Sequence, residues 1–325
     1  MQHQEKLFLI ASRDSLNSLT TLFDFVWPTS AALWNLQWQV KGFIAQVPNA
    51  TTEDLKGRFL QGSEISNSNF HRLANQQTWP ELQQWFARLL LSETCALFEG
   101  WIEAAFDELA IPSSLRKNNT RNSLDKKIQF NTKVDASGIP IDGANFALTQ
   151  ICGTGSNIMR LCFLPTQQTN KKLGSNIDNA LKCYRAFKEA RNDFTHHGGR
   201  ASKRTVDAIT LYHKETASSL GVKEMPIIPM ANLDKPIELS LRGVVGFSDI
   251  VVRIISALDI ALSDSTFAEN LIVSRWIEKH KGRILVKANP LRDSQIRKLA
   301  VQSGLPRPVN EPALYQYLYS QQLVA

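Results

Sequence analysis

A long amphipathic segment between Pro80 and Leu109 is the feature that most limits how this chain of 325 residues can fold. Pro80 and Glu81 stand at its start, where the first turn of a helix favours proline and acidic side chains. Large apolar residues then recur three or four positions apart, as they do on the buried face of a helix: Leu82, Trp85, Phe86, Leu89, Leu90, Leu97, Trp101 and Leu109. We expect a long helix over residues 80–110, covered by other helices.

A second strong helix is predicted over residues 176–197. Its large residues are again spaced by three or four and therefore share one face: Leu181, Tyr184, Phe187, Arg191 and Phe194. Gly198 and Gly199 then offer the left-handed backbone conformation at which many helices end. Further helices are predicted over residues 203–220 and 237–262, so the expected fold class is all-α, with a helical bundle at its centre.

The sequence predicts three regions. Residues 1–79 are expected to form a mostly helical, Trp-rich accessory region in which Pro28 starts a helix. Residues 80–265 form the helical core. Residues 266–325 form a small helical unit that faintly resembles a helix-turn-helix, and a winged helix is one form it could take. Packing or oligomerisation is the favoured role for this unit, because helix pairs are common in domains that bind no DNA.

Composition and cysteine spacing limit the class of protein and the cellular location that we expect. Hydrophobic residues make up 43% and charged residues 21% of the chain, which is typical of globular proteins. No run of about twenty apolar residues predicts a membrane span. The four cysteines are widely spaced and form no CxxC pair, so we expect reduced thiols, no metal site, no cofactor and a cytoplasmic location.

The stretch Lys188-Glu-Ala-Arg-Asn-Asp-Phe-Thr-His-His-Gly-Gly at the end of the second helix carries the candidate chemistry. It places Asn192 directly after Arg191 and puts His196 after four intervening residues, with His197 one position further. Histidine transfers protons near neutral pH, and arginine offers a planar, permanently charged fork for phosphate oxygens. RNA supplies its own nucleophile, the 2′-hydroxyl, so these residue types suffice for cleavage without a metal ion.

This pattern resembles the signature of the HEPN family, the higher eukaryotes and prokaryotes nucleotide-binding domains. The resemblance covers about residues 80–265, and its specific part is the Arg191-Asn192-x3-His196 motif, with His197 as the alternative histidine. It implies an α-helical bundle and an endoribonuclease that leaves a 2′,3′-cyclic phosphate. It also implies a homodimer with a composite active site and a role as a toxin or antiphage effector, with a regulatory or sensor protein as a further partner.

The net charge of +7 suits a polyanionic partner, and the distribution of the basic residues suits it further. Basic residues gather before and after the motif and are predicted to bind RNA: Lys126, Lys127, Arg200, Lys203 and Arg204. Two other functions stay open. The chain could be a HEPN-like binding module without catalysis, or a DNA-binding regulator that uses its C-terminal helices. The last of these helices contains no Lys or Arg, which disfavours the regulator.

Overall fold

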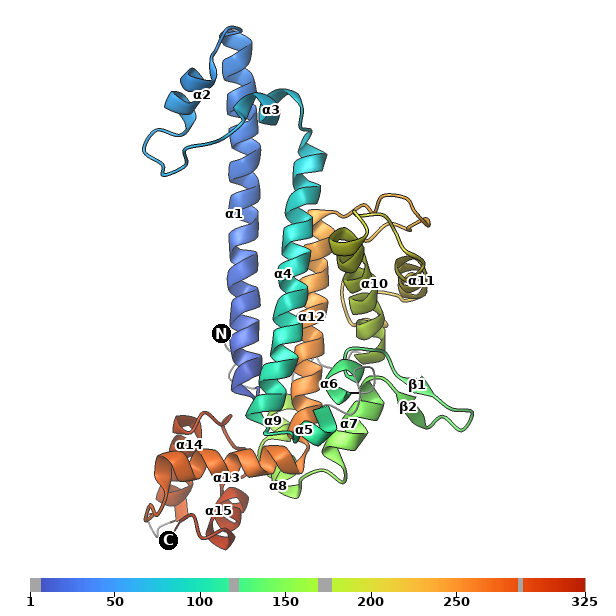
Figure 1. Cartoon of the computed structure of the whole chain (residues 1–325). Helices are drawn as coiled ribbons and strands as arrows, with labels where there is room; N and C mark the ends of the chain where they lie inside the picture. Colours follow the sequence, from blue (N-terminus) through green and yellow to red (C-terminus); the bar gives the residue numbers. More distant parts are fainter. Residues whose placement is uncertain (1–6, 117–122, 169–176, 286–288, 325) are drawn as a thin grey trace.

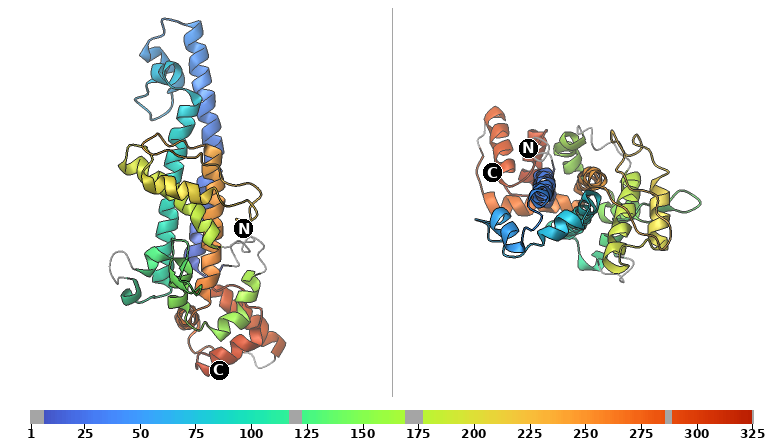
Figure 2. Two further views of the ribbon diagram at one scale, coloured as in Figure 1. Left: turned by 90° about the vertical axis from the view of Figure 1, so that its right-hand side faces the viewer. Right: turned by 90° about the horizontal axis from the view of Figure 1, so that it is seen from above.

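The computed structural model describes residues 7–116, 123–168, 177–285 and 289–324, and they are mainly helical, in agreement with the all-α expectation (Figure 1). Three long helices run side by side: α1 (Ile10–Gln46), α4 (Trp79–Glu108) and α12 (Leu241–Ser263) (Figures 1 and 2). α10 (Ile177–His196) packs against α4 and α12, and α11 (Lys203–Tyr212) packs against α10. No helix among the described residues is long and apolar enough to cross a membrane.

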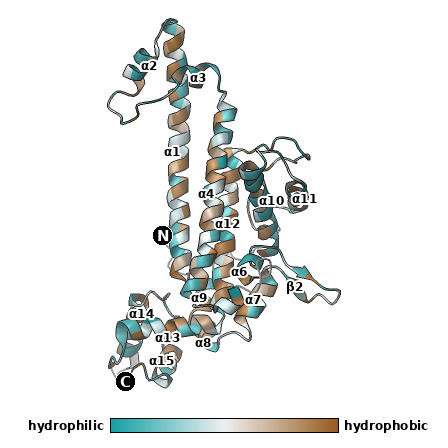
Figure 3. Ribbon diagram, viewed as in Figure 1, coloured by the Kyte–Doolittle hydropathy of each residue, from teal (hydrophilic) through white to brown (hydrophobic). Residues whose placement is uncertain are grey.

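The core lies where α4, α10 and α12 meet, and aromatic rings form much of it. Phe98 packs edge-on against Tyr184, with ring centroids 4.7 Å apart, and Phe187 stacks on Phe247 at 4.5 Å. All four side chains are fully buried, and such ring pairs add to the free energy gained by burial alone. In Figure 3 hydrophobic residues recur along α4 and α12, whereas the outward side of α10 is mostly hydrophilic.

The N-terminal end of α4 follows from its sequence. The Thr78 side chain accepts a hydrogen bond from the backbone N–H of Glu81, and the Glu81 carboxylate accepts one from the backbone N–H of Thr78. This capping box satisfies two amides that the first helical turn leaves without partners. The predicted helix over 80–110 and the observed helix therefore agree to within two residues.

The N-terminal region differs from the prediction at Pro28. α1 runs through this residue for 37 residues instead of starting there. Proline removes one backbone hydrogen bond from a helix, and here it lies on the exposed side. The first half of α1 packs into the main core through Leu16, Leu19 and Val26. The second half projects with α4 beyond the end of α12 (Figure 1).

A small second core closes the projecting end of α1. α2 (Thr52–Phe59) and α3 (Phe70–Asn75) contribute to it, and its buried residues are Val40, Leu55, Phe70, Leu73 and Ala74. The main core, in contrast, is continuous from Leu7 to Val324. It therefore includes buried residues on both sides of the predicted boundaries at 79/80 and 265/266.

Several short elements follow one another along the chain between α4 and α10. They are α5 (Ser113–Arg116), α6 (Leu124–Lys127), α7 (Ala144–Cys152), α8 (Asn157–Cys162) and α9 (Leu164–Gln168). Strands β1 (Lys133–Val134) and β2 (Pro140–Asp142) form an antiparallel hairpin that projects from the bundle (Figure 1).

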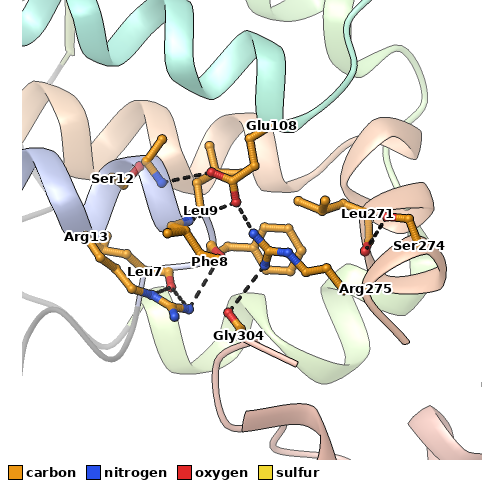
Figure 4. Close-up of polar contacts among 12 residues, drawn as sticks. Leu7, Phe8, Leu9, Ser12, Arg13, Glu108, Leu271, Ser274, Arg275 and Gly304 are labelled. Atoms are coloured by element: carbon orange, nitrogen blue, oxygen red, sulfur yellow. Dashed lines mark hydrogen bonds and ion pairs between the residues drawn. The ribbon is translucent and has the colours of Figure 1, made fainter. Parts of the chain in front are cut away.

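The C-terminal unit consists of α13 (Thr266–His280), α14 (Asn289–Gln302) and α15 (Glu311–Ser320). A buried ion pair joins it to the bundle: Arg275 of α13 contacts Glu108 at the end of α4 (Figure 4). Glu108 also accepts hydrogen bonds from the backbone N–H groups of Ile10 and Ala11, at 2.9 and 2.8 Å. One carboxylate thus connects the start of α1, the end of α4 and the C-terminal unit.

Candidate functional site

The end of α10 places the predicted motif at the surface. The helix ends at His196, and Gly198 and Gly199 follow with φ angles of 60° and 79°. The backbone carbonyl of Asp193 stabilises this C-terminal turn, because it accepts hydrogen bonds from the backbone N–H groups of His197 and Gly199, both at 2.9 Å. The glycines are required here, since other residues rarely adopt the left-handed conformation.

His197 has its ring fixed by a carboxylate. Its Nδ1 lies 2.8 Å from Oδ1 of Asp193, one helical turn earlier. The Asp193 side chain is only 2% exposed, whereas that of His197 is 59% exposed. The other oxygen of Asp193 accepts hydrogen bonds from the Ser202 backbone N–H at 2.7 Å and from the Thr205 hydroxyl at 2.5 Å. When Nδ1 donates to the carboxylate, Nε2 is left with a lone pair that can accept a proton.

His196 is exposed, and its ring has no hydrogen-bond partner within the described part of the chain. It lies about 40° around α10 from Asn192, because four residues advance a helix by slightly more than one turn. Arg191 and His196 are five residues apart, which places them about 140° apart around the helix and therefore on different stripes. Of the two predicted histidines, His197 is therefore the one whose ring the surrounding structure orients.

Arg191 points towards α4 and is half-buried. Its Nη2 donates a hydrogen bond of 2.7 Å to Oε1 of Glu99, and Lys188 Nζ lies 2.9 Å from the same oxygen. Burial raises the pKa of Glu99, but the hydrogen bonds and charges of Lys188 and Arg191 outweigh it and lower the pKa overall. Glu99 is thus ionised at neutral pH and holds the guanidinium of Arg191 between the two helices.

Asn192 borders a pocket of about 430 Å³ between α4, α6 and α10. Its side-chain amide donates a hydrogen bond to Glu189, which is also paired with Arg185. The pocket is lined by both signs of charge: Lys126, Arg185, Lys188 and Arg204 face it together with Glu99, Glu103, Asp125 and Glu189. Neither Arg191 nor either histidine lines this pocket.

Two of the five predicted RNA-binding residues line one pocket. Lys126 and Arg204 meet at the pocket beside Asn192, although 78 positions separate them in the sequence. Lys127 lies 3.4 Å from Asp142 of β2 and packs over a phenylalanine ring, so its charge is already paired. Arg200 donates to the backbone carbonyl of Asp234, and Lys203 is exposed at the start of α11.

Two residues of this arrangement, Asp193 and Glu99, are not among those predicted from the sequence. Asp193 stands four positions before His197, and that spacing on a helix already predicts contact. Glu99 is separated from Arg191 by 92 positions, so only the folded structure identifies it as the partner. The described residues contain no group of three or more His, Cys, Asp or Glu side chains arranged to hold a metal ion.

Comparison with known protein families, with curated proteins and with solved structures gives no match for this chain. The functional proposal therefore rests on the residues of the chain itself.

Proposed function

We propose that this protein is a HEPN-type endoribonuclease that cleaves RNA by 2′-hydroxyl transesterification without a metal ion. The observation that carries the proposal is the exposed His197 ring, which the buried carboxylate of Asp193 holds on the same helix end as Arg191. A histidine oriented by a carboxylate is a recurring arrangement for proton transfer in enzymes.

In the proposed reaction, Nε2 of His197 takes the proton from the 2′-hydroxyl. The 2′-oxygen then attacks the adjacent phosphorus, and the bond from phosphorus to the 5′-oxygen breaks. The leaving oxygen receives a proton from a second histidine, which gives a 2′,3′-cyclic phosphate and a 5′-hydroxyl end. Arg191 stabilises the charge on the phosphate oxygens, after exchanging Glu99 for the phosphate.

Two sources of the second histidine fit this scheme. His196 of the same chain is exposed to solvent. In a homodimer with a composite site, a second copy would supply its own His196 or His197 across the two-fold axis. The HEPN-like character of the bundle, the dimer and the toxin or antiphage role all belong to this proposal.

The rival binding module has one observation in its favour: Arg191 is paired with Glu99, as in a structural contact between helices. The oriented and exposed His197 favours catalysis, because a purely structural histidine needs no exposed Nε2. The DNA-binding regulator has less support, since the described part of the C-terminal unit offers three helices and only a single bridge between Arg283 and Val324 in place of a wing.

The test is cleavage of a mixed RNA pool in excess EDTA by wild type and by the variants His197→Ala, His196→Ala and Arg191→Ala. We expect wild type to leave 2′,3′-cyclic phosphate ends, and we expect His197→Ala and Arg191→Ala to lose cleavage while remaining folded by circular dichroism. An inert wild-type dimer would favour the binding module. Full activity in His197→Ala would overturn the assignment of the base.

A further inference from the structure

A pocket of about 620 Å³ lies between α4 and the segment 227–240. One wall comes from the first turns of α4, with Gln83, Gln84, Trp85 and Arg88. The opposite wall comes from the connection before α12 and includes Ile227, Pro229, Pro236, Glu238, Leu239 and Ser240. The volume is within the range of pockets that bind small organic ligands.

Arg88 is an unusual cation within this pocket. Its guanidinium lies 4.9 Å from the ring centroid of Trp85 and 4.2 Å from that of Phe194 in α10. It has no carboxylate partner among the described residues, and its buried Nε makes no hydrogen bond. Burial lowers its pKa, and no neighbouring acidic group raises it again. A partly desolvated cation that makes no ion pair is costly, so Arg88 suits an anionic ligand, although Glu81 and Glu238 line the same pocket.

Trp85 gives the pocket an aromatic surface. Trp85 is 61% exposed, although the spacing of apolar residues predicted it on the buried face of α4. Unpaired RNA bases stack on aromatic rings and arginine planes, and polar side chains then bind their edges. Gln83 and Glu238 can supply such contacts, since glutamine and glutamate side chains bind the amino groups of bases. The second acidic residue, Glu81, is engaged in the cap with Thr78.

The pocket adjoins the candidate active site through backbone pairing. The backbone N–H of Ile237 donates to the carbonyl of Gly199, and that of Ala201 donates to Lys235, both at 2.9 Å. The Gln84 side chain donates to the carbonyl of Ile237 at 3.2 Å. The segment around Pro236 is therefore hydrogen-bonded to the turn at Gly198 and Gly199, which immediately follows His197. Phe194, which contacts Arg88, lies three residues before His197 and hence on a neighbouring stripe of α10.

We propose that this pocket binds an unpaired RNA nucleotide, with its base stacked on Trp85 and its phosphate at Arg88. The proposal rests on the ribonuclease function proposed above and defines its substrate as single-stranded. It makes Trp85 and Arg88 binding residues for a nucleotide next to the cleaved bond.

The test measures binding of fluorescent 2′-O-methyl oligonucleotides, 12 residues long and of A-rich or C-rich sequence, to the full chain in EDTA. These probes lack the free 2′-hydroxyl and are not cleaved by the proposed reaction. We expect Trp85→Ala to bind about tenfold more weakly or worse, as loss of one stacked base predicts. We expect Trp85→Phe to restore most of the affinity. Arg88→Gln should weaken binding several-fold and reduce the salt dependence, and Arg88→Lys should restore the salt dependence but not the full affinity.

Two matched controls separate this site from general surface effects. Trp38→Ala removes a tryptophan of α1 that is 56% exposed, and Lys279→Gln removes an exposed charge on α13. Both should bind RNA as wild type does. A probe with 5-iodouridine should cross-link to the peptide that contains Trp85, as identified by mass spectrometry.

Binding and cleavage distinguish the two proposals. If wild type binds the probe through Trp85 but does not cleave RNA, the assignment of the pocket is correct and the ribonuclease proposal is wrong. If wild type cleaves RNA while Trp85→Ala and Arg88→Gln bind normally, the pocket assignment is wrong. It is also wrong if wild type binds no RNA, or if Trp85→Ala separates a dimer into monomers, since the pocket would then be a self-association surface.

Discussion

Asp193 holds His197 from one helical turn away, with 2.8 Å between Oδ1 and Nδ1. The carboxylate is itself fixed by the backbone N–H of Ser202, the N-cap of α11, and by the hydroxyl of Thr205 in the first turn of that helix. This chain of contacts makes the orientation of an exposed ring depend on a buried group. Substitution of Asp193, which is not proposed to contact the substrate, should therefore alter the rate of proton transfer by His197.

The first prediction concerns Asp193→Asn. Ser202 and Thr205 should keep the amide oxygen as their acceptor, which turns the amide NH2 towards His197. The ring must then accept a hydrogen bond at Nδ1 and carry its proton on Nε2, so Nε2 loses its function as a base. We expect cleavage to fall by at least about a hundredfold. Initial rates on a defined RNA, with melting temperatures measured by circular dichroism, check this.

Asp207→Asn is the matched control, because Asp207 is exposed on the neighbouring α11. It should cleave at the wild-type rate. Equal rates for Asp193→Asn and Asp207→Asn would mean that Asp193 only stabilises the helix exit.

The second prediction concerns Arg191→Lys. Lysine keeps a positive charge beside Glu99 but loses the planar fork that can bind two phosphate oxygens. We expect cleavage to fall by about tenfold or more, while the melting temperature changes little. Arg160→Lys makes the same replacement in a surface ion pair with Asp264, far along the chain from the motif, and should leave the rate unchanged. A fully active Arg191→Lys would reduce Arg191 to a contact between α4 and α10.

Local patterns predicted those parts of the molecule that neighbouring residues determine. The helices α4 and α10 were predicted within a few residues, because caps, glycine exits and apolar spacing all act over one or two turns. Pro28 was misread as a helix start, since the packing of Leu16, Leu19 and Val26 that keeps α1 continuous involves distant helices. The partners of Arg191 and Phe194 are likewise Glu99 and Arg88, about a hundred positions earlier.

The continuous course of α1 through the main core determines how binding of a partner protein to the N-terminal region can be tested. Removing residues 1–75 would delete part of the main core, so loss of binding would only report unfolding. Trp27 and Trp38 are 53% and 56% exposed, and replacing them leaves the core intact. The proposed sensor or regulatory partner should therefore be tested with Trp27→Ala and Trp38→Ala in the full chain.

The third prediction concerns Glu108→Gln. The change removes the charge that compensates Arg275, whose side chain is only 9% exposed. Breaking a buried ion pair at one partner costs about 3–5 kcal/mol, because the other charge stays buried. We expect a loss of this size in the free energy of unfolding, measured with urea. Glu93→Gln alters an exposed residue of the same helix and should change it by less than about 0.5 kcal/mol. Similar values for both variants would contradict the role of Glu108 as an anchor.

The fourth prediction is a pH dependence that originates at Asp259. Burial raises the pKa of this carboxyl from 3.8 to about 6, although the backbone N–H groups of Phe8 and Leu9 and the Ser12 side chain act in the opposite direction. The folded chain therefore binds this proton more tightly than the unfolded chain does. Its contribution to stability is fully present below about pH 4 and is lost as the pH rises through about 6.

Asp259→Asn isolates this contribution, because its side chain does not titrate while all other groups remain. The difference in unfolding free energy, wild type minus variant, should fall as the pH is raised from about 4 to about 6. The slope should not exceed about 1.4 kcal/mol per pH unit, which is the limit for one proton. Urea titrations of both proteins at intervals across this range measure it. Parallel curves would mean that Asp259 has the same pKa in the folded and unfolded chains, and that its two backbone hydrogen bonds offset its burial.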